Sequence, residues 1–141
     1  MPPSIKRFLS EVKPGRVPQT LWEYSEVGHT QDAKKELLSI LDFSSSNDVF
    51  VTPKPVTLLS RVLELATSEN AIVLDSFAGS GTTAHAVLKA NAKDDGNRRF
   101  ILVEMEDYAD RLTAERVRRV IKGYAYTGTQ REELLNQQLT F

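Results

Sequence analysis

The chain has 141 residues and no cysteine, a composition that argues against a disulfide-stapled secreted domain and against a thiolate metal site. Its 40% hydrophobic and 26% charged residues are ordinary for a soluble globular protein, and its net charge of -1 gives no overall attraction to nucleic acid. No apolar run approaches the ~20 residues that span a bilayer, and the N-terminus lacks the apolar stretch of a signal peptide, so we expect a cytoplasmic protein with no membrane partner.

Residues 1–48 are expected to form an irregular arm or linker that contains one short helix. Four of the six prolines lie in the first 18 residues, and prolines interrupt regular structure. Apolar residues recur at near-helical spacing from Ala33 to Leu41, which predicts a helix over residues 31–41. The polar run over residues 44–48 predicts a loop.

Residues 49–125 have the pattern of an α/β domain, and residues 126–141 are a C-terminal tail with an ambiguous pattern. The expected elements are, in chain order, a helix over 52–70, a strand over 71–74, a helix over 81–91, a turn over 93–97, a strand over 99–104 and a helix over 108–124. Thr52 is the expected N-cap of the first of these helices, because threonine caps helices and prolines are tolerated in the first turn. In the last helix a stripe at helical spacing predicts the buried face: Val117, Val120, Ile121 and Tyr124.

This order, αβαβα with parallel strands, predicts a partial doubly wound α/β fold with an incomplete sheet. Two strands are too few for a stable isolated sheet, and a parallel sheet is normally covered on both faces. We therefore expect the remainder of a longer protein, or a second copy of the chain, to complete it.

The segment around residues 71–83 carries the strongest functional signal. An apolar strand ends at Asp75, passes through the turn Gly79-Ser80-Gly81 and enters an alanine-rich helix, a pattern typical of adenosine-cofactor sites. The two glycines let the backbone turn sharply and approach a ligand closely. The third glycine position of a dinucleotide site falls on Ala84, so the glycines alone leave NAD as an alternative.

Four segments together carry a resemblance to a known family. They are Trp22-x-x-x-x-x-Gly28-x-Thr30-x-x-Ala33-Lys34-Lys35-Glu36-Leu37, Phe50-Val51-Thr52-Pro53-Lys54-Pro55-x-x-Leu58-Leu59, Asp75-x-Phe77-x-Gly79-Ser80-Gly81-Thr82-Thr83, and Phe100-Ile101-Leu102-Val103-Glu104. In this order they resemble the amino-methylating DNA methyltransferases of the permuted, β-type arrangement. They are most similar to the modification subunit of type III restriction systems, and the resemblance covers residues 16–125. It implies a partial Rossmann-like S-adenosylmethionine-dependent methyltransferase fold.

The resemblance implies that the α/β segment binds S-adenosylmethionine through ten residues: Thr52, Lys54, Asp75, Phe77, Ala78, Gly79, Ser80, Gly81, Thr82 and Glu104. Asp75 would accept a hydrogen bond from the methionine ammonium, and Glu104 would bind both ribose hydroxyls. Lys54, beside Thr52, would lie near the methionine carboxylate, with a solvated lysine as the alternative. Phe77 would lie beside the cofactor, with core packing as the alternative, and Thr82 would bond the cofactor or cap the helix.

The catalytic loop of that family, Asp/Asn/Ser-Pro-Pro-Tyr/Phe, does not occur in the sequence. The resemblance therefore implies a cofactor-binding fragment, inactive alone, of a site-specific DNA methyltransferase that methylates an adenine amine in the complete enzyme. A cytosine amine is the alternative acceptor. DNA and a restriction subunit are the implied partners. The alternative function is a non-catalytic nucleotide-binding or assembly module on the same fold.

Three further features have ordinary explanations beside functional ones. A basic cluster near the C-terminus is either a DNA-facing surface or a solvated helix face: Arg111, Arg116, Arg118, Arg119 and Lys122. A lone helical histidine such as His85 is more often packed or solvated than catalytic. His29 has no companion ligands, so no metal site and no catalytic residue are predicted.

Overall fold

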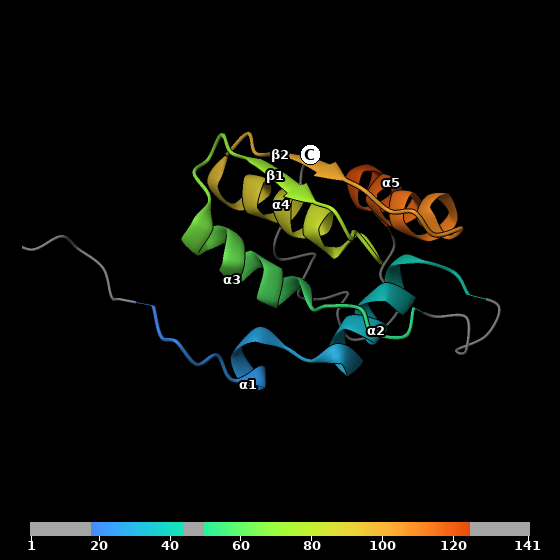
Figure 1. The fold of residues 1–141 in the computed structure, drawn as a ribbon, viewed down its shortest axis with the longest axis horizontal. Coiled ribbons are helices and arrows are strands. Elements are labelled where there is room, and N and C mark those ends of the chain that lie inside the picture. Colours follow the sequence, from blue (N-terminus) through green and yellow to red (C-terminus); the bar gives the residue numbers. More distant parts are fainter. Residues whose placement is uncertain (1–17, 44–49, 125–141) are drawn as a thin grey trace, which may run out of the picture.

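The computed structural model describes residues 18–43 and 50–124. The loop predicted over residues 44–48, the tail over residues 126–141 and the first 17 residues of the predicted arm lie outside the described residues. The described part is a mixed helix and strand structure with one small parallel sheet (Figure 1).

The sheet consists of two parallel strands, as predicted. β1 (Ile72–Asp75) pairs with β2 (Arg99–Leu102) from one end to the other, and α4 (Thr82–Asp94) connects them. α3 (Val56–Ala66) packs against α4, and both helices lie on one side of the sheet (Figure 1). Val73 and Phe100 point to that side and pack against the apolar residues of the two helices.

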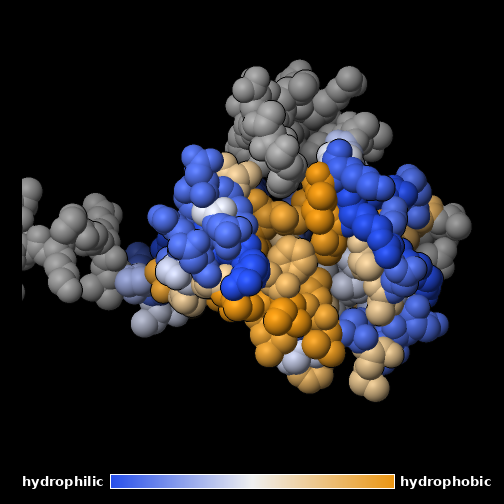
Figure 2. Space-filling view, turned by 90° about the horizontal axis from the view of Figure 1, so that it is seen from above, coloured by the Kyte–Doolittle hydropathy of each residue, from blue (hydrophilic) through white to orange (hydrophobic). Residues whose placement is uncertain are grey.

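The opposite face of the sheet is apolar and exposed. Ile72, Leu74 and Ile101, together with Val103 just beyond β2, are each at least 50% exposed. In the space-filling view from above, a hydrophobic surface lies between hydrophilic flanks (Figure 2). Exposed apolar surface on a parallel sheet is unusual, because such sheets are normally buried on both faces. The described residues therefore form half of a layered structure, consistent with an incomplete methyltransferase-like α/β fold.

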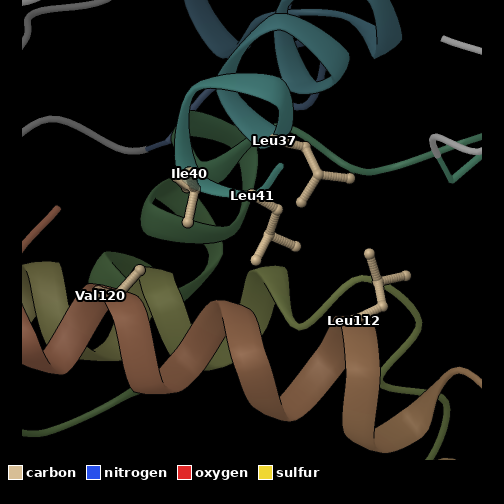
Figure 3. Packing of buried hydrophobic residues seen from close by; sticks show 5 residues of the cluster. All are labelled: Leu37, Ile40, Leu41, Leu112 and Val120. Carbon is tan, nitrogen blue, oxygen red and sulfur yellow. The ribbon is translucent and has the colours of Figure 1, made fainter. Parts of the chain in front are cut away.

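A second core joins α2 (Thr30–Ile40) to the helical segment over residues 109–122. Its buried side chains interlock between these two elements (Figure 3): Leu37, Ile40, Leu41, Leu112 and Val120. His29 is the N-cap of α2 and forms a capping box, since its Nδ1 accepts from the Asp32 amide while the Asp32 carboxylate accepts from the His29 amide. The short helix α1 (Tyr24–Val27) contacts α3.

One predicted helix start and one predicted strand end were wrong. α3 begins at Val56, not at Thr52, and its N-cap is the extended residue Pro55. The reason is steric: Thr52 and Lys54 each precede a proline, and a residue before proline is disfavoured from the helical conformation. β2 also ends two residues before Glu104, which was predicted to be its last residue.

The predicted helix over residues 108–124 is two helices of different kinds. A π-helical segment, η3 (Ala109–Ala114), leads directly into α5 (Glu115–Lys122). The predicted stripe was also displaced, because Ile121 is 48% exposed while Leu112, Arg116 and Val120 are buried. Buried residues therefore recur every four residues in this segment, and the middle one of the three is an arginine.

Candidate functional site

The turn after β1 lies where the strand ends and α4 begins. The Asp75 carboxylate accepts two hydrogen bonds from residues on either side of the turn: Oδ1 accepts from the Phe77 amide at 3.1 Å, and Oδ2 accepts from the Thr83 hydroxyl at 2.5 Å. This places an acid at the carboxyl end of a parallel strand, where ligands bind in α/β proteins. The first residues of α4 lie beside it with their backbone N–H groups at the positive end of the helix dipole.

Both glycines of the turn have backbone conformations that side chains disfavour. Gly79 has φ +53° and Gly81 has φ +75°. A Cβ on Gly81 would lie 3.0 Å from the backbone carbonyl oxygen of Thr113, and one on Gly79 would lie 3.3 Å from the Phe50 ring. The glycines are thus required by the packing around the turn, whatever ligand it approaches.

Glu104 joins the end of β2 to this turn. Its Oε2 accepts from the Gly79 amide at 2.8 Å, and its Oε1 accepts from the amides of Met105 at 3.0 Å and Glu106 at 3.2 Å. The hydrogen bond from the Glu106 amide, followed by that from the Gly79 amide, holds the pKa of the Glu104 carboxyl below its usual value. A charged carboxylate therefore lies at the carboxyl edge of the sheet, beside the turn.

A cavity of about 340 Å³ opens at this edge. Its lining includes eight of the ten predicted residues: Thr52, Lys54, Asp75, Phe77, Ala78, Gly79, Ser80 and Thr82. Gly81 is buried behind the lining, and Glu104 reaches the lining through its bond to Gly79. The volume lies within the ~300–1,000 Å³ that small-molecule sites occupy. The structure thus brings together two segments, around residues 52 and 75, that were linked only by resemblance.

Three lining residues were not predicted as site residues: Phe50, Leu59 and Thr83. Phe50 and Leu59 belong to the segment that carries the resemblance, which was the available signal. Phe77 is 88% exposed, so the alternative of core packing for this aromatic was wrong. A larger cavity of about 560 Å³ lies among α1, α3 and α4, and no predicted site residue lines it.

His85 and the basic cluster do not belong to the cavity lining. His85 is 5% exposed, and burial, with the charges of Arg116 and Lys89, lowers its pKa to about 3, so it is a packed neutral histidine. Arg111 forms an ion pair with Asp107, which lies just before η3, and Arg118 with Asp110 and Glu115. Arg119 pairs with Glu115 and Asp42. Arg116 is fully buried. Burial thus removes Arg116 from the predicted basic surface, whereas Arg111, Arg118 and Lys122 are exposed, and a DNA-facing surface there stays a prediction.

No helix within residues 18–43 and 50–124 is long and apolar enough to span a membrane. In the same ranges no group of three or more His, Asp or Glu side chains is arranged to hold a metal ion.

Comparison with curated proteins found relatives in restriction-modification systems. The StyLTI Mod subunit, a type III restriction-modification enzyme of Salmonella typhimurium, is 43% identical over 83 residues, which are 59% of this chain and 12% of that protein. The EcoPI Mod subunit of Escherichia phage P1 is 38% identical over 94 residues, 67% of this chain and 14% of the subunit. The type II methyltransferase M.KpnI of Klebsiella pneumoniae is 37% identical over 100 residues, 71% of this chain and 22% of that enzyme.

The chain thus spans less than a quarter of the length of each of these relatives. A family model described as DNA methylase matches residues 4–115, which include the whole of the cavity lining. These findings confirm the resemblance to DNA methyltransferases. Since the match covers most of its residues, this chain belongs to the DNA methylase family.

Proposed function

We propose that this chain is the S-adenosylmethionine-binding part of a site-specific DNA methyltransferase of a restriction-modification system, with an adenine amine as the acceptor. The observation that carries the proposal is the cavity at the carboxyl end of β1, where a lysine, an aspartate and an exposed aromatic ring meet a glycine turn. The relatives support it by their names, since two are type III modification subunits.

The residues of the cavity fit the chemistry of the cofactor. S-adenosylmethionine supplies an activated methyl group on a sulfonium sulfur. Asp75 would accept from its ammonium, while Lys54 and the N-terminal amides of α4 would balance its carboxylate. Phe77, which is exposed beside the turn, would pack against the cofactor. Glu104 would accept from one ribose hydroxyl through the lone pair of Oε2 that its three backbone bonds leave free.

The chain supplies the donor side of the reaction and lacks the acceptor side. A tetrapeptide of the Asp/Asn/Ser-Pro-Pro-Tyr/Phe kind does not occur in its sequence. Methylation of a base amine needs a polar clamp on the amine and an extruded base. We therefore propose that the chain alone transfers no methyl group, and that DNA and a restriction subunit bind through the complete enzyme.

Binding of the cofactor is the first prediction. Calorimetric titration of the chain with S-adenosylmethionine is expected to give a micromolar dissociation constant, and Asp75→Asn is expected to weaken it about ten- to a hundredfold, because a hydrogen bond between charged groups is lost. Asp107→Asn is the matched control, since Asp107 lies on the exposed surface and pairs only with Arg111 among the described ion pairs. Equal affinities of the Asp75 and Asp107 variants would contradict the assignment of the ammonium site.

The same titration, together with the addition of a polypeptide that carries the catalytic tetrapeptide, distinguishes the proposal from two alternatives. NAD is expected not to compete with S-adenosylmethionine, and competition at equal concentrations would favour a dinucleotide site. A non-catalytic assembly module would also bind the cofactor. It differs in that a polypeptide carrying the catalytic tetrapeptide would not restore methyl transfer to DNA.

The apolar face of the sheet is the surface that we propose for this completing polypeptide, in a Rossmann-like fold. Leu74 and Ile101 are register partners at its centre and are 65% and 53% exposed. Burying one such side chain stabilises an interface by about 1.5–3 kcal/mol, whereas a buried lysine opposes it. Leu74→Lys is therefore expected to abolish restoration of methyl transfer and to leave cofactor affinity unchanged.

Leu65→Lys on α3 is the matched control for this prediction, because Leu65 is also an exposed leucine, 45% exposed, and lies outside the sheet. It is expected to keep full restoration, measured as transfer of a labelled methyl group to DNA. If both variants restored activity equally, the sheet face would not be the docking surface.

A further inference from the structure

Arg116 is the largest fully buried side chain among the described residues, with 0% exposure. A buried guanidinium loses its hydration, and such a loss is offset only by well-placed partners. Its position is therefore informative about which groups of the molecule it organises. It comes from α5, but its contacts are made with the turn, α4 and α2.

One end of the guanidinium holds the glycine turn. Nη1 donates to the Ser80 carbonyl at 3.2 Å, to the Ser80 hydroxyl at 3.3 Å and to the Thr82 hydroxyl at 2.9 Å. The hydroxyls of Ser80 and Thr82 are themselves 3.1 Å apart. A single nitrogen thus contacts the residues on both sides of Gly81.

The other end is anchored away from the turn. Nη2 donates to Glu36 Oε2 of α2 at 3.4 Å and to His85 Nδ1 of α4 at 3.2 Å. Because the His85 ring stays neutral, its Nδ1 is available as an acceptor. Two helices therefore fix the direction in which Arg116 presents its Nη1 to the turn.

A second residue of the same segment acts on the turn from the same side. Thr113 lies three residues before Arg116, so both project from one helical face. Its hydroxyl donates to the Gly79 carbonyl at 2.5 Å, and its own carbonyl lies against Gly81. Thr113 belongs to the π-helical segment, a feature that is frequent at functional sites.

We infer that Arg116 is a positioning residue for the cofactor cavity: its guanidinium holds Ser80 and Thr82, which line the cavity, so that the turn has its binding conformation before the ligand arrives. The inference rests on the proposed function, because the benefit to the cofactor comes from this preorganisation. Arg116 touches the turn from the buried side and acts through Ser80 and Thr82.

The test compares Arg116→Lys and Arg116→Met with Arg119→Lys in the full chain. Arg119 is the matched control, since it is an arginine of the same helix that bonds Glu115, Asp42 and the Ile40 carbonyl. With each variant fully folded, as checked by urea unfolding, calorimetry with S-adenosylmethionine is expected to show about tenfold weaker binding for Arg116→Lys, a greater loss for Arg116→Met and no change for Arg119→Lys.

Hydrogen exchange without ligand provides a readout that overall stability does not move. The Gly81 amide, which donates to the Ala78 carbonyl at 2.8 Å, is expected to exchange about tenfold faster in Arg116→Lys than in the wild type, while amides of β1 and β2 keep their rates. Unchanged exchange and affinity in folded Arg116→Lys would overturn the inference. Absence of cofactor binding by the wild type would overturn the proposed function instead, and the exchange result would still decide whether Arg116 holds the turn.

Discussion

Replacing Gly81 with alanine is expected to lower the free energy of unfolding by about 2–3 kcal/mol and to weaken S-adenosylmethionine binding about a hundredfold. Two costs add at this residue. Its φ of +75° is in the left-handed region, which disfavours a side chain by about 1–2 kcal/mol. The new Cβ would also lie 3.0 Å from the Thr113 carbonyl oxygen, a backbone atom that moves only with the helix.

Urea unfolding and calorimetric titration measure the two effects separately. Gly123→Ala is the control, because Gly123 also has a positive φ of +77° but a Cβ there would have no atom within 4 Å. We expect Gly123→Ala to keep the cofactor affinity of the wild type. An alanine at residue 81 that bound the cofactor normally would show that the turn tolerates displacement from Thr113.

The strands and the turn were predictable from the sequence because their signals are local. An apolar run ending in an acid, followed by two glycines and an alanine-rich stretch, predicted β1, the turn and α4 to within a few residues. The start of α3 was predictable in principle and was placed too early. The preference of Thr52 for capping was weighed there, while the restriction that Pro53 and Pro55 impose on their preceding residues was not.

The contacts of Thr113 and Arg116 with the turn were not predicted, because the arginines of this segment were grouped by their charge and not by their helical spacing. Arg116 was grouped with its basic neighbours as a surface cation, yet it lies four residues from both Leu112 and Val120, which are buried. That spacing places it at the centre of the buried face. Thr113 lies in the π-helical segment η3 and Arg116 in α5, which packs against α2 and α4. These tertiary contacts have no local signature in the sequence.

The residues of the cavity lining were likewise predictable from local motifs, but their arrangement in space was not. Eight lining residues were predicted from motifs, but their juxtaposition is a tertiary fact: Thr52 and Lys54, which lie before the start of α3, line the same cavity as Asp75 at the carboxyl end of β1. The late start of α3 therefore has a consequence for the site, since it leaves Thr52 and Lys54 outside the helix, at the cavity wall.

Acidification is expected to destabilise the chain through His85. Burial, followed by the nearby charges of Arg116 and Lys89, lowers the pKa of His85 from 6.5 to about 3 in the folded state. Between these values the unfolded chain binds a proton that the folded chain does not, so stability is complete above pH 6.5 and is lost as the pH falls toward 3. The resulting loss between pH 7.5 and pH 5.0 is about 2 kcal/mol.

Comparison with His85→Gln isolates this contribution, because glutamine offers an acceptor to Arg116 but does not titrate. The control matters because Glu36, which accepts from the same Arg116 nitrogen as His85, has a pKa raised by burial, and its protonation stabilises the folded state as the pH falls. His29, the second of the two histidines, is present in both proteins and cancels. Urea unfolding at both pH values should show the wild type losing about 2 kcal/mol more than His85→Gln. Equal losses would mean that His85 accepts a proton in the folded state. The positive charge of Arg116 would then move away from the protonated ring and would not oppose its protonation.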